Sequence, residues 1–422
     1  MTPEPRSTHP HPRSAAVVGA GMAGLSTAWF LQERGVRVSV FDQAWPGAGA
    51  SWGNAGWITP TLTTPLPEPG LVPRAVRGML RPGSPLFIPP TVDPALAAFL
   101  ARFARNTTAA RWSAGVRAFA RINRLALGAY DVLTAGGVDC PLREAEPFVL
   151  AFADTGGLRD EIAAADRLAA LGQPVDIEPV PADRARALAP MLTGRVHAAA
   201  LLHGQRFLDP PAYVAALARA VRDRGGTIHD DVHVASVREL GGRVELTGTD
   251  GAIGSADAAV IATGAALPAL ARHHGVRLRM RAGRGYSFAV APDDPPVGPV
   301  YFPGAAVVCT PLGQRMRIAG MMEFRRHGAP LDPRRIDAIA AAVRPLLRGV
   351  DLDDRADEWV GSRPCTVDGL PLIGRTRTPQ VYVAGGHAME GMTLGPATGR
   401  LLAESIVTGT VPAAIAPFDP LR

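Results

Sequence analysis

The chain has 422 residues, of which 47% are hydrophobic, with a formal net charge of +6. All 44 basic residues are arginine, and the absence of lysine excludes a pyridoxal phosphate Schiff base and an ATP-binding P-loop. Three cysteines, Cys140, Cys309 and Cys365, are too few and too widely spaced for a disulfide framework or a metal site. We therefore expect a cytoplasmic protein without metal. No apolar run approaches the roughly 20 residues of a membrane span.

The arginines are scattered among acidic residues along the chain, so the positive balance does not indicate a nucleic acid partner. The densest basic stretch runs from Arg102 to Arg124 and includes Phe103 and Trp112. Two interpretations remain open for it. The favoured one is the solvated face of a domain helix. The other is a basic amphipathic helix at the inner face of a membrane, as a peripheral contact.

The first predicted elements form a strand–helix–strand unit. Residues 15–18 are a short apolar run typical of a buried parallel strand, and 36–41 form the next strand. Between them, GAGMAG at 19–24 opens a helix that extends to about residue 34. In such a unit Gly19 permits a tight turn, Gly21 lets the backbone approach a pyrophosphate, and Gly24 allows close helix–strand packing.

This unit predicts a dinucleotide site. The helix start at Met22 and Ala23 offers free N–H groups to a diphosphate. Asp42 follows Gly24 by 18 positions, at the end of the second strand, where a carboxylate binds ribose hydroxyls. Its negative charge disfavours the 2′-phosphate of NADP, and the unit alone leaves the choice between FAD and NAD open.

The remaining elements follow in chain order. Residues 45–90 are rich in Gly and Pro, too long for an idle connection, and are expected to cover a site. The later expected elements are helical segments at 94–133, a strand at 147–151, a helix at 158–171, a helix at 211–224, a strand at 227–229, a hairpin at 234–240 and 243–247, a strand at 257–262, antiparallel strands within 277–325, a helix at 333–347, a strand at 380–384 and a final helix at 395–408 with Pro396 in its first turn.

Nucleotide-type segments therefore recur at the start, the middle and the end of the chain. At this length two domains are expected. We predict an α/β fold in which a Rossmann-like dinucleotide-binding domain (1–90, 205–275 and 355–422) is interleaved with an α+β substrate domain (91–204 and 276–354). The second domain is expected to be built on an antiparallel sheet.

Several further motifs carry a resemblance to a known family. Residues 260–264 read VIATG, residues 51–56 read SWGNAG, and WVGSRP at 359–364 is followed by DGLPLIG at 368–374. GGH at 385–387, GMTL at 391–394 and PATG at 396–399 continue the pattern. Together these segments resemble the D-amino-acid oxidase and glycine oxidase superfamily, and within it the bacterial FAD-dependent D-amino-acid dehydrogenases.

The resemblance implies a Rossmann-like FAD-binding domain. Cys365 falls about four places late for the cysteine through which related N-methyl amino-acid oxidases link their flavin, so FAD is expected to be noncovalent. The start of the final helix would stabilise negative charge on the flavin. The residues expected to bind FAD are Gly19, Gly21, Met22, Ala23, Gly24, Asp42, Gln43, Asn54, Ala55, Gly56, Val234, Thr263, Gly264, Gly361, Gly386, His387, Gly391, Met392, Thr393 and Leu394.

For the substrate, the resemblance implies that Arg363 binds a carboxylate. The alternative is a surface ion pair with Asp354 or Asp357. Tyr286, in a Gly-Tyr-Ser segment similar to the flavin-facing strand of the dehydrogenases, is expected to donate to the same carboxylate or else to be a core tyrosine.

One departure concerns the second arginine of glycine oxidases. The corresponding loop here carries Met389, which cannot bind an anion, and Glu390, which would repel one. Arg363 and Tyr286 would then hold the carboxylate alone, or the substrate is not glycine. His387 follows two glycines, which favours a backbone role over catalysis by its ring.

The expected reaction is oxidative deamination by hydride transfer from Cα to flavin N5, on a D-amino acid or a related secondary or cyclic amino acid. Relatives of the sarcosine-oxidase type use a lysine to activate O2, and the lack of lysine favours a quinone or another electron acceptor. The alternatives are an O2-using amine or glycine-type oxidase, an NAD-dependent dehydrogenase, and a flavoprotein that acts as a membrane-surface or partner-binding module. Chirality and oligomeric state are left open.

Overall fold

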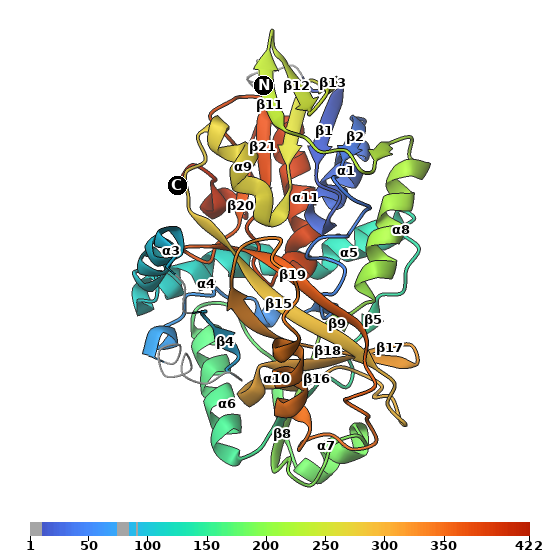
Figure 1. Ribbon diagram of the computed structural model, residues 1–422, viewed down its shortest axis with the longest axis vertical. Coiled ribbons are helices and arrows are strands. Elements are labelled where there is room, and N and C mark those ends of the chain that lie inside the picture. The colour runs from blue at the N-terminus through green and yellow to red at the C-terminus, as the bar shows by residue number, and fades with distance from the viewer. Residues whose placement is uncertain (1–10, 74–83, 90–91) are drawn as a thin grey trace, which may run out of the picture.

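The computed structural model describes residues 11–73, 84–89 and 92–422. It contains two large sheets, each with its own helices, that lie one above the other in the view of Figure 1. This mixed architecture confirms the predicted combination of a Rossmann-like domain and an antiparallel sheet.

The first sheet has six strands, of which all but the last are parallel to their neighbours. Their order is β10 (Thr227–His229), β2 (Arg37–Phe41), β1 (Ser14–Val18), β14 (Ala258–Ile261), β21 (Val381–Gly385) and β20 (Leu372–Arg375). Side chains of β1 alternate between the two faces, so Ala15 and Val17 enter one hydrophobic core and Ala16 and Val18 enter another.

Helices cover one face of this sheet and a small antiparallel sheet covers the other. The helices of the first face are α1 (Met22–Gln32), α8 (Pro210–Asp223) and α11 (Gly391–Thr408). The second face carries β11 (Ser236–Leu240), β12 (Arg243–Gly248), β13 (Gly251–Ala256) and α9 (Leu267–Ala271). The helices α1 and α11 can pack closely because Gly399 has no side chain. A Cβ on Gly399 would lie 2.5 Å from the backbone of Ser26.

The final helix begins earlier than predicted. It starts at Gly391, and Pro396 lies inside it rather than in its first turn. Proline lacks an N–H, so the carbonyl of Met392, four residues earlier, has no helical donor. The hydroxyl of Tyr130 donates to that carbonyl at 2.6 Å and replaces the missing bond.

The second sheet has nine strands and is mostly antiparallel, as predicted. Its main path is β19 (Ala356–Thr366), β15 (Met280–Val290), β18 (Arg315–Phe324), β17 (Val307–Leu312), β16 (Val300–Phe302), β6 (Val149–Phe152), β8 (Ala198–Leu202) and β7 (Ile177–Val180), with β4 (Leu86–Phe87) beside β18. Its helices are α6 (Thr155–Ala170), α7 (Ala182–Leu188) and α10 (Pro333–Val343).

The remaining elements connect the two sheets. A small sheet is formed by β3 (Trp57–Ile58), β9 (Arg206–Phe207) and β5 (Arg143–Glu144). Three further helices are α3 (Pro94–Ala104), α4 (Ala109–Asn123) and α5 (Ala126–Ala135), and the 3-10 turns are η1 (Pro60–Leu62), η2 (Gly264–Ala266), η3 (Arg272–His274), η4 (Pro303–Ala305) and η5 (Ala416–Phe418). None of the described helices is both long and apolar enough to cross a membrane.

Two of the predicted domain boundaries need correction. The boundary at 355 is too early, because β19 pairs along most of its length with β15 of the second sheet. The boundary at 91 is also wrong for α4 and α5, whose residues Ile122, Ala129 and Leu133 lie in the helical core of the first sheet. Both helices contact α11, so burial of their apolar faces places them in the dinucleotide-binding domain.

Candidate active site

A cavity of about 620 Å³ lies where the two large sheets meet. The first sheet contributes the carboxyl ends of β1, β2, β14 and β21, which is where open parallel sheets bind ligands. The second sheet contributes Arg284 of β15 and residues 360–364 of β19. The cavity therefore joins the predicted nucleotide segments to the predicted substrate segment.

The glycine-rich turn has the shape that the sequence predicts. Gly19 has φ +109°, and a Cβ there would lie 2.4 Å from the carbonyl oxygen of Ala262. A Cβ on Gly24 would lie 1.9 Å from the carbonyl oxygen of Gly19, which explains the close packing of α1. At Gly21, in contrast, a Cβ would touch only Ser51 Oγ at 3.5 Å, and Gly21 lines the cavity.

The start of α1 fits a diphosphate. The helix has no side-chain cap, and the backbone N–H of Met22 reaches only Ser51 Oγ at 3.3 Å. Uncapped N–H groups and the positive end of a helix form an anion site. Thr263 also lines the cavity, and its Oγ1 is buried without a hydrogen-bond partner among the described residues. These unsatisfied donors fit the diphosphate and sugar of the expected FAD.

Asp42 lies at the end of β2 and lines the cavity beside Gln43. Its carboxylate accepts from the backbone N–H of Ala20 at 2.6 Å and of Ala44 at 3.0 Å. Burial raises the pKa of Asp42, and these backbone bonds oppose the shift. The side chain thus closes the glycine turn at the wall of the cavity.

Most of the predicted cofactor residues come together in this cavity. Those that line it are Gly19, Gly21, Met22, Ala23, Asp42, Gln43, Asn54, Val234, Thr263, Gly264, Gly361, His387, Gly391 and Met392. The others, Gly24, Ala55, Gly56, Gly386, Thr393 and Leu394, do not line the cavity. Gly56 shows why: a Cβ there would lie 2.1 Å from Leu208 O, so this glycine serves close backbone packing.

His387 is held in a neutral state. Its Nε2 lies 2.9 Å from Thr398 Oγ1 on α11, and burial lowers the pKa of His387 to about 4. Its backbone forms a bridge with Cys365, beside the cavity. This geometry favours the backbone role expected for His387 over proton transfer by its ring.

Arg363 reaches into the cavity from β19. Its guanidinium lies over Gly285, where a Cβ would be 2.2 Å from Arg363 Cζ, and its NH1 donates to Met321 O at 2.8 Å. Met321 adopts φ +64°, which is unusual for a residue with a side chain. The Nε and NH2 groups of Arg363 have no acceptor among the described residues. Burial lowers the pKa of Arg363, and the group remains a cation.

The surface ion pair considered for Arg363 does not form. Asp357 instead pairs with Arg315 at 3.3 Å, and Asp354 has no bond to Arg363. The free N–H groups of Arg363 are therefore available to a ligand carboxylate.

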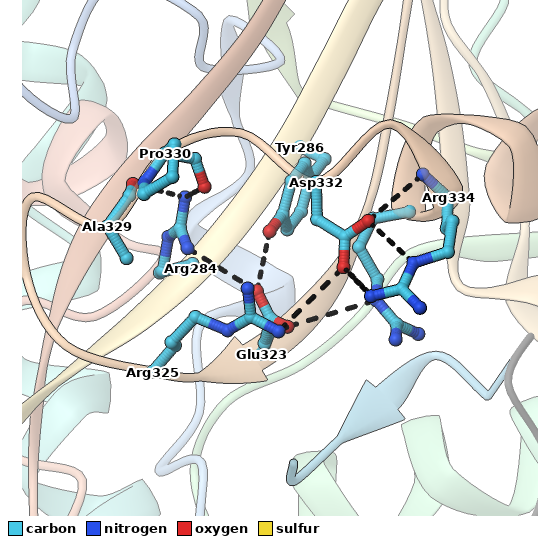
Figure 2. A network of polar contacts seen from close by, with 9 residues as sticks. Arg284, Tyr286, Glu323, Arg325, Ala329, Pro330, Asp332 and Arg334 are labelled. Carbon is cyan, nitrogen blue, oxygen red and sulfur yellow. Dashed lines mark hydrogen bonds and ion pairs between the residues drawn. The ribbon is translucent and has the colours of Figure 1, made fainter.

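Tyr286 does not face the cavity, contrary to one of the two expectations for it. Its hydroxyl donates to Glu323 Oε2 at 2.5 Å, and the side chain is fully buried (Figure 2). It packs in the core of the second sheet with Phe288 and Ile339. Sequence reasoning instead missed Arg284, two residues earlier on the same strand, which lines the cavity.

The loop that differs from glycine oxidases carries Met389 and Glu390, and these two side chains point in different directions. Met389 lines the cavity, whereas Glu390 does not. Glu390 Oε2 accepts from Thr63 Oγ1 at 2.7 Å, and burial raises the pKa of Glu390 to about 7. Glu390 thus turns toward Thr63 and does not line the cavity.

The cysteines take no part in the cavity lining. Cys140, Cys309 and Cys365 are free and buried, and burial raises the pKa of the Cys365 thiol to about 12. Such a thiol is a poor nucleophile. Within residues 11–73, 84–89 and 92–422, no cluster of three His, Cys, Asp or Glu side chains is placed to hold a metal ion.

The amino-acid sequence is similar to those of known bacterial enzymes over nearly its whole length. The chain is 29% identical to a D-amino acid dehydrogenase of Agrobacterium fabrum, over 94% of this chain and 96% of the relative. It is 32% identical to a D-amino acid dehydrogenase of Cereibacter sphaeroides, over 94% of this chain and 92% of the relative.

Solved structures share the fold. Glycine oxidase from Geobacillus kaustophilus superposes with a TM-score of 0.72 at 22% identity, covering 98% of this chain and 99% of that one. L-proline dehydrogenase from P. horikoshii superposes with a TM-score of 0.73 at 16% identity, covering 98% of each chain. The profile of the DAO family, described as FAD dependent oxidoreductase, matches residues 14–405. The chain therefore belongs to the DAO family of FAD-dependent oxidoreductases, which confirms FAD over the NAD-dependent alternative.

Proposed function

We propose that this oxidoreductase is a D-amino acid dehydrogenase, which oxidises the bond between Cα and nitrogen of a D-amino acid or a related secondary or cyclic amino acid. The observation that carries the proposal is Arg363. Its guanidinium is buried at the wall of the same cavity that holds the glycine turn, with two nitrogen groups free for a carboxylate. A planar guanidinium binds a carboxylate through two parallel hydrogen bonds. The names of the two relatives support a D-amino acid as the substrate.

The chain's own residues would act mainly by positioning. The residues from Gly19 to Gly24, with Asp42 and Thr263, would hold a noncovalent FAD. Bound FAD supplies a hydride acceptor at N5. Arg363 would fix the substrate carboxylate and so orient the Cα–H bond, a geometric effect that accounts for much of the rate in such reactions. The start of α11, at Gly391 and Met392, presents the positive end of a helix to the cavity. The imine from a primary amino acid then hydrolyses in water to a 2-oxo acid and ammonia, whereas a cyclic amino acid gives a cyclic imine.

We also propose that the electrons pass to a quinone or a similar carrier rather than to O2. The chain contains no lysine, so no lysine side chain can assist the reaction of O2 with a flavin. The exposed arginines of α4, which include Arg111, Arg117 and Arg121, offer a basic surface for peripheral contact with an anionic membrane that holds such a carrier. A purified enzyme that reduces quinone analogues much faster than O2 would support this acceptor.

The substrate proposal is tested by anaerobic mixing of the purified yellow protein with D-, N-methyl and cyclic amino acids. The flavin absorbance should bleach with at least one of them. Arg363→Gln should lower kcat/KM by about 10- to 100-fold, because it removes charged hydrogen bonds to the carboxylate. Arg315→Gln, on the same sheet but exposed and outside the cavity lining, is the matched control and should behave as wild type. Absence of bleaching by the whole panel would reject the proposal.

A further inference from the structure

Residues 51–56, here called the wall segment, contain no helix or strand and pass along the cavity. Ser51 and Asn54 line the cavity, and Ser51 Oγ accepts from the backbone N–H of Met22 at 3.3 Å. The wall segment therefore borders the start of α1, where the diphosphate of FAD is expected to bind. The contacts that fix this segment also shape the FAD site.

Three consecutive carbonyls of the wall segment accept hydrogen bonds from the second sheet. Arg317 NH1 on β18 donates to Trp52 O at 2.8 Å and to Asn54 O at 3.2 Å. Ser287 Oγ on β15 donates to Gly53 O at 2.9 Å. Backbone carbonyls shielded from water need such donors, so the second sheet supplies the bonds that hold the wall segment in place.

The neighbouring strands of the second sheet add two further contacts. Trp359 on β19 packs so close to Gly53 that a Cβ there would lie 2.1 Å from its ring. Thr310 on β17 lies opposite Arg317, and its Oγ1 accepts from Trp57 Nε1 at 2.9 Å. Opposite residues of an antiparallel pair share one face of the sheet. Arg317 thus belongs to a docking face to which the adjacent strands β19, β15, β18 and β17 all contribute (Figure 1).

Arg317 is a buried cation without a counter-ion. Its side chain is 5% exposed, and no carboxylate of the described chain forms an ion pair with it. Asp357 pairs instead with Arg315, two residues earlier on β18, at 3.3 Å. Burial lowers the pKa of Arg317, and the group remains a cation.

Burying such a charge without an ion pair is costly. The two carbonyls of the wall segment offset part of this cost, and so does the ring of Trp52, whose centroid lies 5.3 Å from Arg317 Cζ. These stabilising contacts of the guanidinium all come from the wall segment. The position of this segment and the burial of Arg317 are therefore coupled.

We infer that Arg317 is a positioning residue for FAD, which holds the carbonyls of Trp52 and Asn54 and thereby keeps the wall segment against the bound cofactor. The wall segment follows β2 of the first sheet, whereas Arg317 belongs to the second sheet. Retention of FAD then depends on contact between the two sheets. This inference goes beyond the proposed substrate, because it involves only the binding of FAD.

The test follows the release of FAD from the holoenzyme after dilution, as a rise in flavin fluorescence. Arg317→Gln should increase the rate constant of release by about 10-fold or more, because charged hydrogen bonds to both carbonyls are lost. Arg317→Lys keeps a charged donor at the same position. Its release rate should therefore lie closer to that of wild type than the rate of Arg317→Gln.

Arg315→Gln is the matched control. Arg315 lies on the same strand, but it is exposed and pairs with Asp357 rather than with the wall segment. Its loss should leave the release rate as in wild type. Ser287→Ala is a milder second variant, which keeps the test valid if Arg317→Gln does not fold. It removes the neutral bond to Gly53 O and should speed release by about two- to tenfold.

A purely structural role for Arg317 gives a different result. In that case Arg317→Gln lowers the melting temperature but releases FAD at the wild-type rate well below that temperature. This outcome would overturn the inference, and so would equal acceleration in Arg315→Gln, which would indicate a general effect of charge. Release is measured without substrate. A protein whose flavin no amino acid bleaches would therefore reject the proposed function and leave this test unaffected.

Discussion

The two sides of the cavity are built in different ways. The nucleotide side is made of backbone: glycines at 19, 21 and 24, uncapped N–H groups of α1, and a carboxylate that closes the turn. The opposite side is made of long side chains from β15 and β19, held by contacts with residues distant in sequence. A backbone cradle tolerates almost no added atoms, whereas a wall of side chains can change its specificity through single substitutions. The comparison explains how one fold can keep its cofactor and vary its substrate.

The largest expected effect comes from adding a side chain to the glycine-rich turn on the nucleotide side. Gly21→Val should give a folded protein that has lost most of its FAD, about a 10-fold reduction in flavin content or more, because the new side chain would enter the cavity next to the diphosphate site. Flavin content per protein, measured by absorbance after purification, is the readout. Circular dichroism should show an unchanged fold.

Gly128→Val provides the control for this substitution. Gly128 lies on α5, exposed, with no atom within 4 Å of a Cβ placed there. The variant should keep its flavin. A Gly21→Val protein that remained yellow would show that the cradle does not touch the cofactor.

The same contrast explains what could be predicted from the sequence. The turn at Gly19 and the two strands on either side of it lie where they were predicted, because turn, helix start and spacing are local properties of the chain. The position of Tyr286 could not be derived in this way, because the sequence does not show which face of β15 is covered by α10. Arg284 was missed for a related reason: its contacts, Ala329, Pro330 and Glu323, come from other segments.

The start of α11 was predicted four residues late for a physical reason of its own. Proline was taken to mark the first turn, which is its usual position in helices. Here a tyrosine on α5 supplies the hydrogen bond that Pro396 cannot, and no sequence pattern links Tyr130 to Met392. A long-range bond thus overrides a local rule.

A pair of neighbouring tyrosines sharpens this point. Tyr130→Phe should reduce the free energy of unfolding by about 1–3 kcal/mol, because it leaves the Met392 carbonyl buried without a donor. Tyr213 lies with its ring 5.3 Å from that of Tyr130, and its hydroxyl is buried with no partner. Tyr213→Phe should therefore be neutral or slightly stabilising. Thermal unfolding of the two variants measures the difference, and equal destabilisation would contradict the role given to Tyr130.

The smallest expected effect lies where the two sides meet, at Glu390. Burial raises the pKa of Glu390 to about 7, above its usual value of 4.5. Between these two values the unfolded chain loses the proton while the folded chain keeps it. The contribution of Glu390 to stability is therefore greatest below pH 4.5 and is lost as the pH rises toward 7.

Glu390→Gln removes this titration and keeps an oxygen that accepts from Thr63. Its melting temperature should match that of wild type near pH 4.5 and exceed it at pH 8, by roughly 2 °C. The pKa of His387, lowered to about 4, affects both proteins alike and cancels in the difference. A difference in melting temperature that stayed constant between pH 4.5 and pH 8 would mean that Glu390 is ionised in the folded protein. The junction of the two regions would then carry an additional negative charge beside Arg363, where a substrate carboxylate is expected to bind.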